Sequence, residues 1–154
     1  MQNNRNGAPV TDIRYSLQAK TSVTFDGATV NDMGDQDGTG NPHTLFTVSG
    51  PVLIEVIGYC TADLTGASAT VEVGVAGSTA ALIAQTTATA IDAGEIWHDA
   101  TPDAKLEAST VMVQQLVNDL DIIQTVGTAN VTGGSIDYVA YWYPLSPDAS
   151  VTAA

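Results

Sequence analysis

Basic residues are scarce in this chain, which has four Lys and Arg against seventeen Asp and Glu and a net charge of −13 at neutral pH. Proteins that bind nucleic acid neutralise its phosphates with Lys and Arg, so the composition argues against a nucleic-acid partner. Three of the four cations lie in the first 20 residues, where Asp12 is the one acid, so this segment carries +2 and the other 134 residues carry −15. A mildly basic segment on an acidic body can be attracted to an acidic partner or can fold back on its own domain.

Cysteine and histidine are scarce as well. Cys60 is the single cysteine, so the chain cannot form an internal disulfide, and its place in the apolar run 52–60 predicts a buried, unreactive thiol. The two histidines, His43 and His98, lie in unrelated loop-like settings. The sequence has no Gly-x-Ser-x-Gly elbow, phosphate-binding loop or His-Glu-x-x-His pair. We therefore expect a protein that is not an enzyme and needs no cofactor.

The chain also has no long apolar run. Its longest uncharged run, residues 73–91, contains many Gly, Ser, Thr and Gln residues and does not read as a transmembrane helix. The first seven residues have no apolar stretch of the kind found in a signal peptide, so we expect no membrane partner. With 44% hydrophobic and 14% charged residues, the 154-residue chain has enough apolar side chains to fold as one domain.

The residues that are present divide the chain into three parts. Residues 1–43 are predicted to form an N-terminal arm and loop, with an extended arm over 1–20, one possible short strand over 21–30 and a turn-rich loop over 31–43. From Thr44 the composition changes to β-branched and apolar runs separated by Gly, Asp, Asn and Pro, which predicts a β domain over residues 44–146. Residues 147–154 are predicted to be a short, exposed C-terminal tail.

Short strands at intervals of 8 to 12 residues make the predicted domain mainly β. In the last of them, Ile136, Tyr138, Ala140 and Trp142 alternate with residues of the opposite face, as a half-buried strand requires. Residues 106–120 are ambiguous between a helix and a strand pair turning near Asn118, and we favour strands. About eight strands without a clear helix predict an antiparallel β-sandwich or jelly roll. The predicted strands cover residues 45–48, 52–60, 69–75, 81–87, 95–98, 122–126 and 135–143, beside those expected within 106–120.

The densest polar cluster is Asp32, Asp35 and Asp37, just before Gly38. Several carboxylates in one loop are typical of calcium sites. An EF-hand register with Gly38 at the glycine position would place Met33 at the first ligand position and Thr44 at the last, which excludes that motif. A looser calcium site remains an alternative to solvated loop carboxylates, and we expect no other metal site.

Five segments of the chain resemble small virion proteins of tailed bacteriophages, above all the head-decoration, or cement, proteins. The resemblance covers about residues 44–150 and lies in the segments 44–50, 71–77, 96–102, 121–123 and 142–148. It implies a β-rich subunit, commonly a homotrimer, that is made in the host cytoplasm and binds the major capsid protein on the outer surface of the virion. Such a subunit stabilises the expanded shell by mass action, because it binds only the assembled form.

The N-terminal arm is the candidate for binding that partner. Its basic residues would serve as polar anchors and its alternating apolar residues would suit strand addition to a neighbouring sheet; alternatively, the arm packs on its own domain or on sister subunits. The polar anchors are Arg5, Arg14 and Lys20, and the apolar ones are Ile13, Tyr15 and Leu17.

Two other functions fit the same sequence. One is a phage tail, baseplate or fibre subunit, since these parts use similar β domains. The other is a carbohydrate-binding β-sandwich with Trp97, or the group Tyr141, Trp142 and Tyr143, as its stacking platform. Exposed aromatic rings would favour the carbohydrate module, whereas buried rings are expected for core and subunit contacts.

Overall fold

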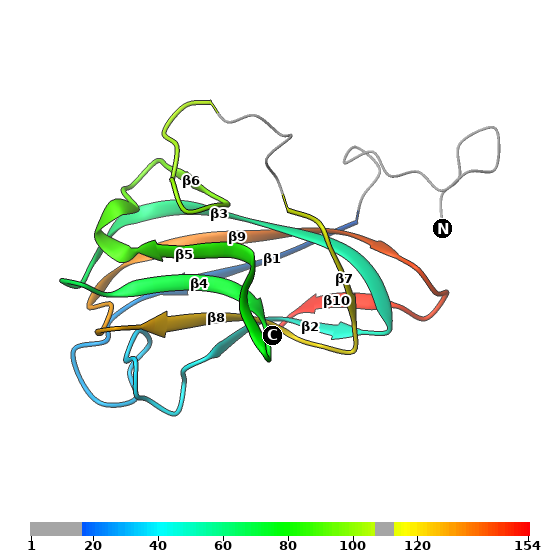
Figure 1. Cartoon of the computed structure of the whole chain (residues 1–154), viewed down its shortest axis with the longest axis horizontal. Coiled ribbons are helices and arrows are strands. Elements are labelled where there is room, and N and C mark those ends of the chain that lie inside the picture. Colours follow the sequence, from blue (N-terminus) through cyan, green and yellow to red (C-terminus); the bar gives the residue numbers. More distant parts are fainter. Residues whose placement is uncertain (1–16, 107–112) are drawn as a thin grey trace.

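The computed structural model of the chain describes residues 17–106 and 113–154 and is mainly β, with every strand pairing antiparallel. These residues form ten strands in two five-stranded sheets (Figure 1). The first sheet contains β1 (Leu17–Thr24), β9 (Gly133–Pro144), β3 (Pro51–Thr65), β6 (Ile96–Trp97) and β7 (Gln115–Asn118). The second contains β10 (Ser150–Ala153), β2 (His43–Ser49), β8 (Ile122–Gly127), β4 (Thr70–Val75) and β5 (Ser78–Thr87). A 3-10 turn, η2 (Ala88–Ala90), follows β5.

The strand pairs are nested along the chain. The innermost pair is β4 with β5; outside it, β3 pairs with β6 and β7, then β2 with β8, and the outermost pair is β1 with β9. The chain therefore resembles one long hairpin in which strands from the first half pair with strands from the second half. Both halves contribute strands to both sheets. β10 adds a further strand to the edge of β2.

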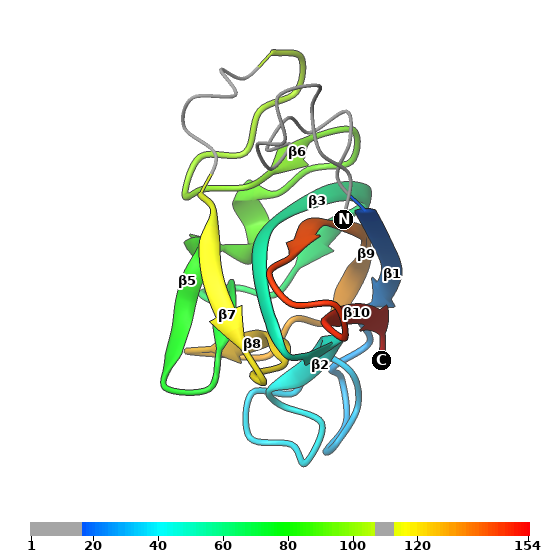
Figure 2. The same ribbon diagram turned by 90° about the vertical axis from the view of Figure 1, so that its right-hand side faces the viewer.

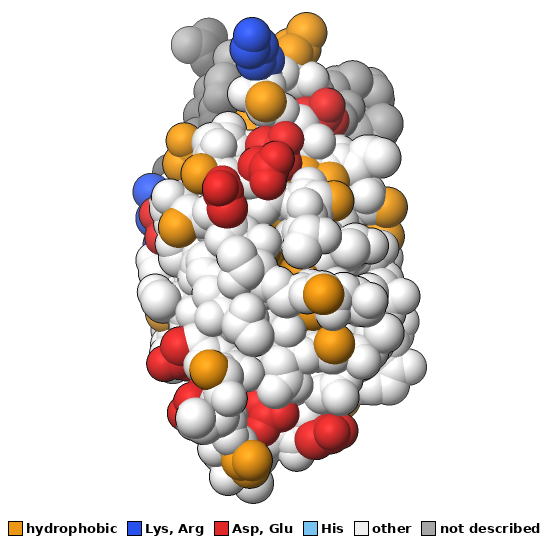
Figure 3. Space-filling model, turned by 90° about the vertical axis from the view of Figure 1, so that its left-hand side faces the viewer, with side chains coloured by type: hydrophobic (Ala, Val, Ile, Leu, Met, Phe, Trp, Pro, Cys, Tyr) orange, Lys and Arg blue, Asp and Glu red, His pale blue; other side chains and the backbone are white. Residues whose placement is uncertain are grey.

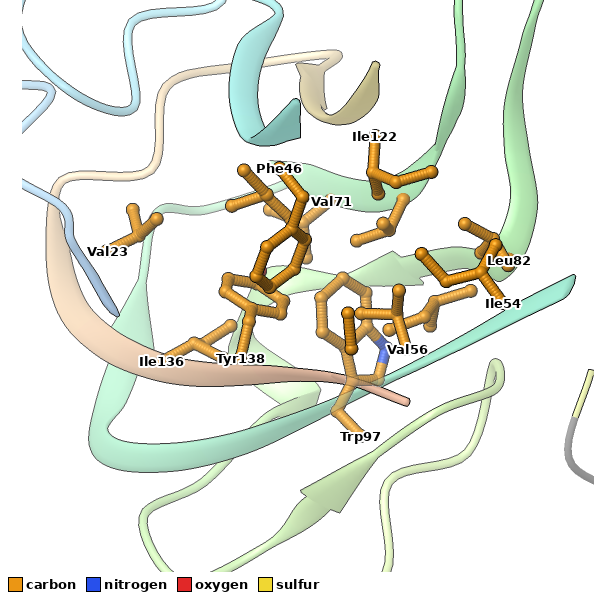
Figure 4. Close-up of a cluster of buried hydrophobic side chains, with 14 of the residues drawn as sticks. Val23, Phe46, Ile54, Val56, Val71, Leu82, Trp97, Ile122, Ile136 and Tyr138 are labelled. Atoms are coloured by element: carbon orange, nitrogen blue, oxygen red, sulfur yellow. The ribbon is translucent and has the colours of Figure 1, made fainter. Parts of the chain in front are cut away.

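One hydrophobic core is built from both sheets, because each strand directs alternate side chains inward. On β9 the inward residues are Ile136, Tyr138, Ala140 and Trp142, which confirms the alternation predicted for that strand. Trp97 and Tyr138 are the largest fully buried side chains, and their ring centroids lie 6.3 Å apart (Figure 4).

Two hydrogen bonds cross the core from one sheet to the other. The Tyr138 hydroxyl on β9 donates to Gln124 Oε1 on β8 over 2.6 Å. Trp97 Nε1 on β6 donates to Thr86 Oγ1 on β5 over 2.9 Å. Buried polar groups without partners are costly, so these two bonds favour one relative position of the sheets.

The folded body is longer than the predicted range 44–146. β1 begins at Leu17, within the predicted arm, and β10 lies within the predicted exposed tail 147–154. Both strands are rich in polar and small residues because one of their faces meets solvent, whereas Val23 of β1 and Val151 of β10 are buried in the core. With these two strands the described residues have ten strands, where the sequence predicted about eight.

The ambiguous segment 106–120 is a strand where the structure describes its second half. Gln115–Asn118 forms β7 and pairs with β3, whereas residues 107–112 lie outside the described residues. The chain then turns at Asp119, whose φ is 52°, and enters the other sheet as β8. Within the described ranges, no helix has the length and apolar character needed to cross a membrane.

Candidate interaction surface

The outer face of the first sheet is unusually apolar. An antiparallel sheet commonly buries one face and exposes a polar one. Here the outward residues of β3 include Leu53 and Ile57, and they lie opposite Tyr143 and Val139 of β9. Leu116 of β7 lies opposite Leu53 on the same face and is 73% exposed. We call this set, with Tyr59 and Tyr141, the outer sheet face.

Few charges lie on the outer sheet face. Glu55 is directly opposite Tyr141, is only 6% exposed and accepts a hydrogen bond of 3.2 Å from Gln114 Nε2. Lys20 and Asp137 are the other charged residues at paired positions on this face, and Asp63 lies in the irregular end of β3. A low density of charge together with aromatic side chains is typical of the centre of a protein interface.

A shallow pocket of about 320 Å³ lies at one end of this face. Its wall is formed by Tyr59 of β3, Asp137 and Val139 of β9, and Lys20 and Ser22 of β1. The Ser22 hydroxyl donates to Asp137 Oδ1 over 2.6 Å, and the Tyr59 side chain is 49% exposed. An aromatic ring beside an ammonium and a carboxylate group can hold a polar side chain of a partner or a sugar.

Apart from Glu55 and Asp137, many of the acidic side chains lie in other parts of the molecule. Figure 3 shows them in two groups, at the top and at the bottom of the view, with a broad uncharged region between them. The described acids include Asp63, Asp92 and Glu95, close to one another: Asp63 Oδ1 accepts from the Ala93 N–H over 2.7 Å, and Glu95 Oε2 accepts from the Asp92 N–H over 2.9 Å.

Of the predicted arm anchors, the structure describes Leu17 and Lys20. Both belong to β1 and are paired with Trp142 and Val139 of β9, so this part of the predicted arm lies in the chain's own sheet. Leu17 therefore pairs with β9 on one side of its strand. Lys20 lines the pocket. Arg5, Ile13, Arg14 and Tyr15 lie outside the described residues.

Two of the three loop aspartates, Asp32 and Asp35, act as acceptors within turns. Asp35 accepts from the backbone N–H groups of Asn31 over 2.8 Å and Asp37 over 3.1 Å, and Asp32 accepts from the N–H of Thr29 over 3.2 Å. Residues 17–106 and 113–154 contain no group of three or more His, Cys, Asp or Glu that could hold a metal ion. The hydrogen bonds of Asp32 and Asp35 are of the kind that stabilises turns.

The predicted stacking platforms are largely buried. Trp97 is 0% exposed and Trp142 is 7% exposed, so neither tryptophan offers a face to a sugar, and the prediction of Trp97 as a platform is wrong. Both rings point inward because bulky apolar side chains stabilise the core. Tyr59, which the sequence did not single out, is the exposed aromatic of this sheet. The sequence does contain a pattern that could have identified the face on which Tyr59 lies. In residues 52–59 both alternating sets of side chains are largely apolar, and such a strand is expected to be covered on both faces.

The cysteine and the two histidines are the remaining candidates for reactive side chains. Cys60 is buried, and burial, together with the nearby carboxylates of Asp63, Glu95 and Asp92, raises the pKa of its thiol to about 11, as expected for an unreactive cysteine. Burial lowers the pKa of His43. His98 is buried at 4% exposure in a different part of the chain.

Comparison with known proteins found no match: no family model, no curated protein and no solved structure matches this chain. The class that the structure defines is therefore that of a mainly β protein with two antiparallel sheets.

Proposed function

We propose that the fold is a β-sandwich of the jelly-roll type. Jelly rolls are double-sheet domains of eight strands, and they occur in viral capsid proteins, lectins and cupins. The nested pairs support this assignment, because they give two sheets with the orders β1-β9-β3-β6 and β2-β8-β4-β5. In this scheme β6 and β7 together occupy one strand position, and β10 is an addition at the edge.

We further propose that the protein is a non-enzymatic virion subunit, a capsid decoration protein that binds the major capsid protein on the outer capsid surface. The observation that carries the proposal is the outer sheet face, where Leu53, Ile57, Val139, Tyr141 and Leu116 gather with little charge in a chain of net charge −13. Burying such a face against another protein is favourable, and it avoids bringing the acidic groups together.

The function would follow from binding alone. A subunit that binds the expanded shell and not the unassembled protein stabilises the shell by about 2.7 kcal/mol per site when its free concentration is 100 times its Kd. As the resemblance implies, we propose that the chain acts as a homotrimer on the shell, which a native mass measurement tests directly.

The test is binding to undecorated, expanded capsids of the tailed bacteriophage that carries the gene. Val139→Lys places a charge at the centre of the outer sheet face, and Gln85→Lys adds the same charge on exposed β5 of the other sheet. We expect cosedimentation of the wild-type chain and of Gln85→Lys with the shells, and loss of binding for Val139→Lys. Absence of wild-type binding would exclude the decoration role. Equal binding of Val139→Lys and Gln85→Lys would exclude the outer sheet face as the capsid-binding surface.

The contribution of the arm requires a truncation that keeps β1 intact. Removal of residues 1–16 leaves Leu17–Thr24 in place, whereas removal of residues 1–20 would delete half of this strand. Reduced capsid binding after the shorter truncation would support anchoring through Arg5, Ile13, Arg14 and Tyr15. Unchanged binding would exclude the arm from attachment.

Two alternatives make different predictions. A tail, baseplate or fibre subunit could use the same surface, and labelling the chain in images of the particle distinguishes tail from head. The pocket beside Tyr59 favours a carbohydrate-binding module as the other alternative. In that case Tyr59→Ala would abolish glycan binding, while acrylamide would quench the buried tryptophans weakly with or without the glycan.

A further inference from the structure

β1 is a long and regular edge strand. It pairs with β9 in unbroken register from Leu17↔Trp142 to Thr24↔Ser135, and no other described strand pairs with its second side. Figure 2 shows β1 at the border of the molecule, beside β9. The other edges are shorter or irregular: β10 and β7 have four residues each, β6 has two, and β5 pairs with register shifts. Natural proteins usually protect long edges with proline, bulges or several charges, and β1 has only Lys20.

The phase of the hydrogen bonds shows which backbone groups face the open side. Phe25, which continues β1, donates its N–H to Gly134 O of β9 over 2.9 Å. Because hydrogen-bonded and non-hydrogen-bonded pairs alternate in an antiparallel ladder, the odd-numbered residues of β1 bond to β9. The even-numbered residues therefore direct their N–H and C=O groups to the open side. These residues are Gln18, Lys20, Ser22 and Thr24, and all four are exposed.

We propose that this edge binds a second copy of the chain, with the two β1 strands antiparallel about a twofold axis at Thr21. In this register Lys20 of one copy lies opposite Ser22 of the second copy, and Gln18 lies opposite Thr24. All four outward-directed residues then form hydrogen-bonded pairs, for about eight backbone hydrogen bonds across the axis. The inward side chains Ala19 and Val23 also lie opposite each other, so the core-facing sides of the two sheets align.

The neighbouring registers are less favourable. Residues directly opposite each other must point to the same face of the sheet. A twofold axis between two residues would place an even-numbered residue opposite an odd-numbered one, and these point to opposite faces. The axis therefore has to pass through a residue position. An axis at Lys20 would place two ammonium groups opposite each other, and like charges in that position are destabilising. An axis at Ser22 would leave residues 17–19 without partners in β1 of the second copy. The axis at Thr21 is therefore the register that the sequence of β1 favours.

Charge complementarity supports the same occupant. Lys20 and Lys105 are the cations among the described residues of a chain with net charge −13. In the proposed pair, Lys20 lies opposite Ser22 of the second copy, whose hydroxyl already bonds to Asp137 over 2.6 Å. Each ammonium group therefore approaches a carboxylate of the other copy, and the two contacts are related by symmetry. The contact lies on a twofold axis, whereas the contacts within a trimer are related by a threefold axis. The proposed contact therefore joins either two single chains or two trimers.

Cysteine cross-linking of the full chain tests the register. Thr21 would form a non-hydrogen-bonded pair with its own copy, with Cα atoms about 4.5 Å apart, which is within the range of a disulfide. We expect Thr21→Cys to give a covalent dimer under oxidising conditions. Thr24→Cys is the control, because in this register the two Thr24 positions lie roughly 20 Å apart along the strands. The native thiol, Cys60, is buried and does not compete. Failure of Thr21→Cys to cross-link, or equal cross-linking of Thr24→Cys, would overturn the register.

Native mass and charge reversal test the contact without any capsid, so the result is independent of the decoration role. We expect six chains per particle if the proposed homotrimer forms in solution, and two if the trimer forms only on the shell. Lys20→Glu should raise the dissociation constant of the pair about tenfold, because it places a carboxylate beside Asp137 of the second copy. Lys105→Glu, with the same charge change in a loop, should leave it unchanged. A native mass of one or three chains, or equal effects of the two variants, would refute the proposal.

Discussion

The hydrogen bond between Tyr138 and Gln124 is the sharpest test of how the two sheets are held together. The hydroxyl and the amide oxygen are 2.6 Å apart, and the two residues are 0% and 1% exposed. Tyr138→Phe removes the donor and leaves a buried acceptor, which costs about 1–3 kcal/mol. A domain of this kind has a free energy of unfolding of roughly 5–15 kcal/mol, so the loss should be easy to measure.

A double-mutant cycle separates the bond from the packing. Gln124→Met keeps the length of the side chain and leaves the Tyr138 hydroxyl without this acceptor, so we again expect a loss of about 1–3 kcal/mol. With both changes together neither partner remains unsatisfied, and the combined loss should be smaller than the sum of the single losses by at least about 1 kcal/mol. Tyr59→Phe is the control, because Tyr59 is 49% exposed and its hydroxyl should matter by no more than about 0.5 kcal/mol.

The assay is urea unfolding, followed by tryptophan fluorescence and circular dichroism at one fixed protein concentration. A fixed concentration is necessary because self-association would add to the apparent stability. Two results would refute the reasoning: a stability of Tyr138→Phe within about 0.5 kcal/mol of the wild type, or single losses that simply add in the double variant.

The remaining predictions concern other parts of the fold. Burial raises the pKa of Cys60 from 9.0 to about 11 and that of Tyr138 well above its usual value. The unfolded chain therefore loses these protons at a lower pH than the folded chain does. The contribution of these groups to stability should be full below pH 9 and fall as the pH rises toward 11, which alkaline unfolding curves would show. Gly34→Ala should lower the free energy of unfolding by at least about 2 kcal/mol, because φ at Gly34 is 106° and the added Cβ would clash with Val131 O. Gly40→Ala is the control: open space surrounds Gly40, so the change should be nearly neutral. Thermal unfolding of the two variants measures the difference. Millimolar calcium should give no heat in calorimetry, because the Asp35 carboxylate already accepts two backbone N–H groups; a clear binding isotherm would contradict this.

Much of the β structure could be predicted from local pattern. The alternation in 136–142 correctly indicated which side chains of β9 face the core, and the turn residues at Gly66 and Gly77, both with positive φ, separate the predicted strands where the structure separates them. Cys60 is buried, as its apolar neighbours indicated. These features depend on residues close together in the chain, so a sequence window contains the information that produces them.

The candidate surface could be predicted only in part. Lys20 was expected to contact a partner, and it lines the pocket, but Tyr59 and Asp137 were not connected with it. These residues meet because β1, β3 and β9 pair across long stretches of chain: Ser22 and Asp137 are bonded across a separation of 115 residues. No local periodicity encodes such a partner, since pairing depends on the summed contacts of whole strands.

The sequence by itself determined that this protein is acidic, mainly β and poor in histidine and cysteine, because composition and short-range periodicity are properties of the chain alone. The tertiary structure decided the rest: that β1 and β10 belong to the sheets, that both tryptophans are buried while Tyr59 is exposed, and that one long edge strand stays unpaired on its second side among the described residues. The physical reason is that a strand gains its stability from the strands beside it. Which strands lie side by side depends on contacts between segments far apart in the sequence, and these contacts form only when the whole chain folds.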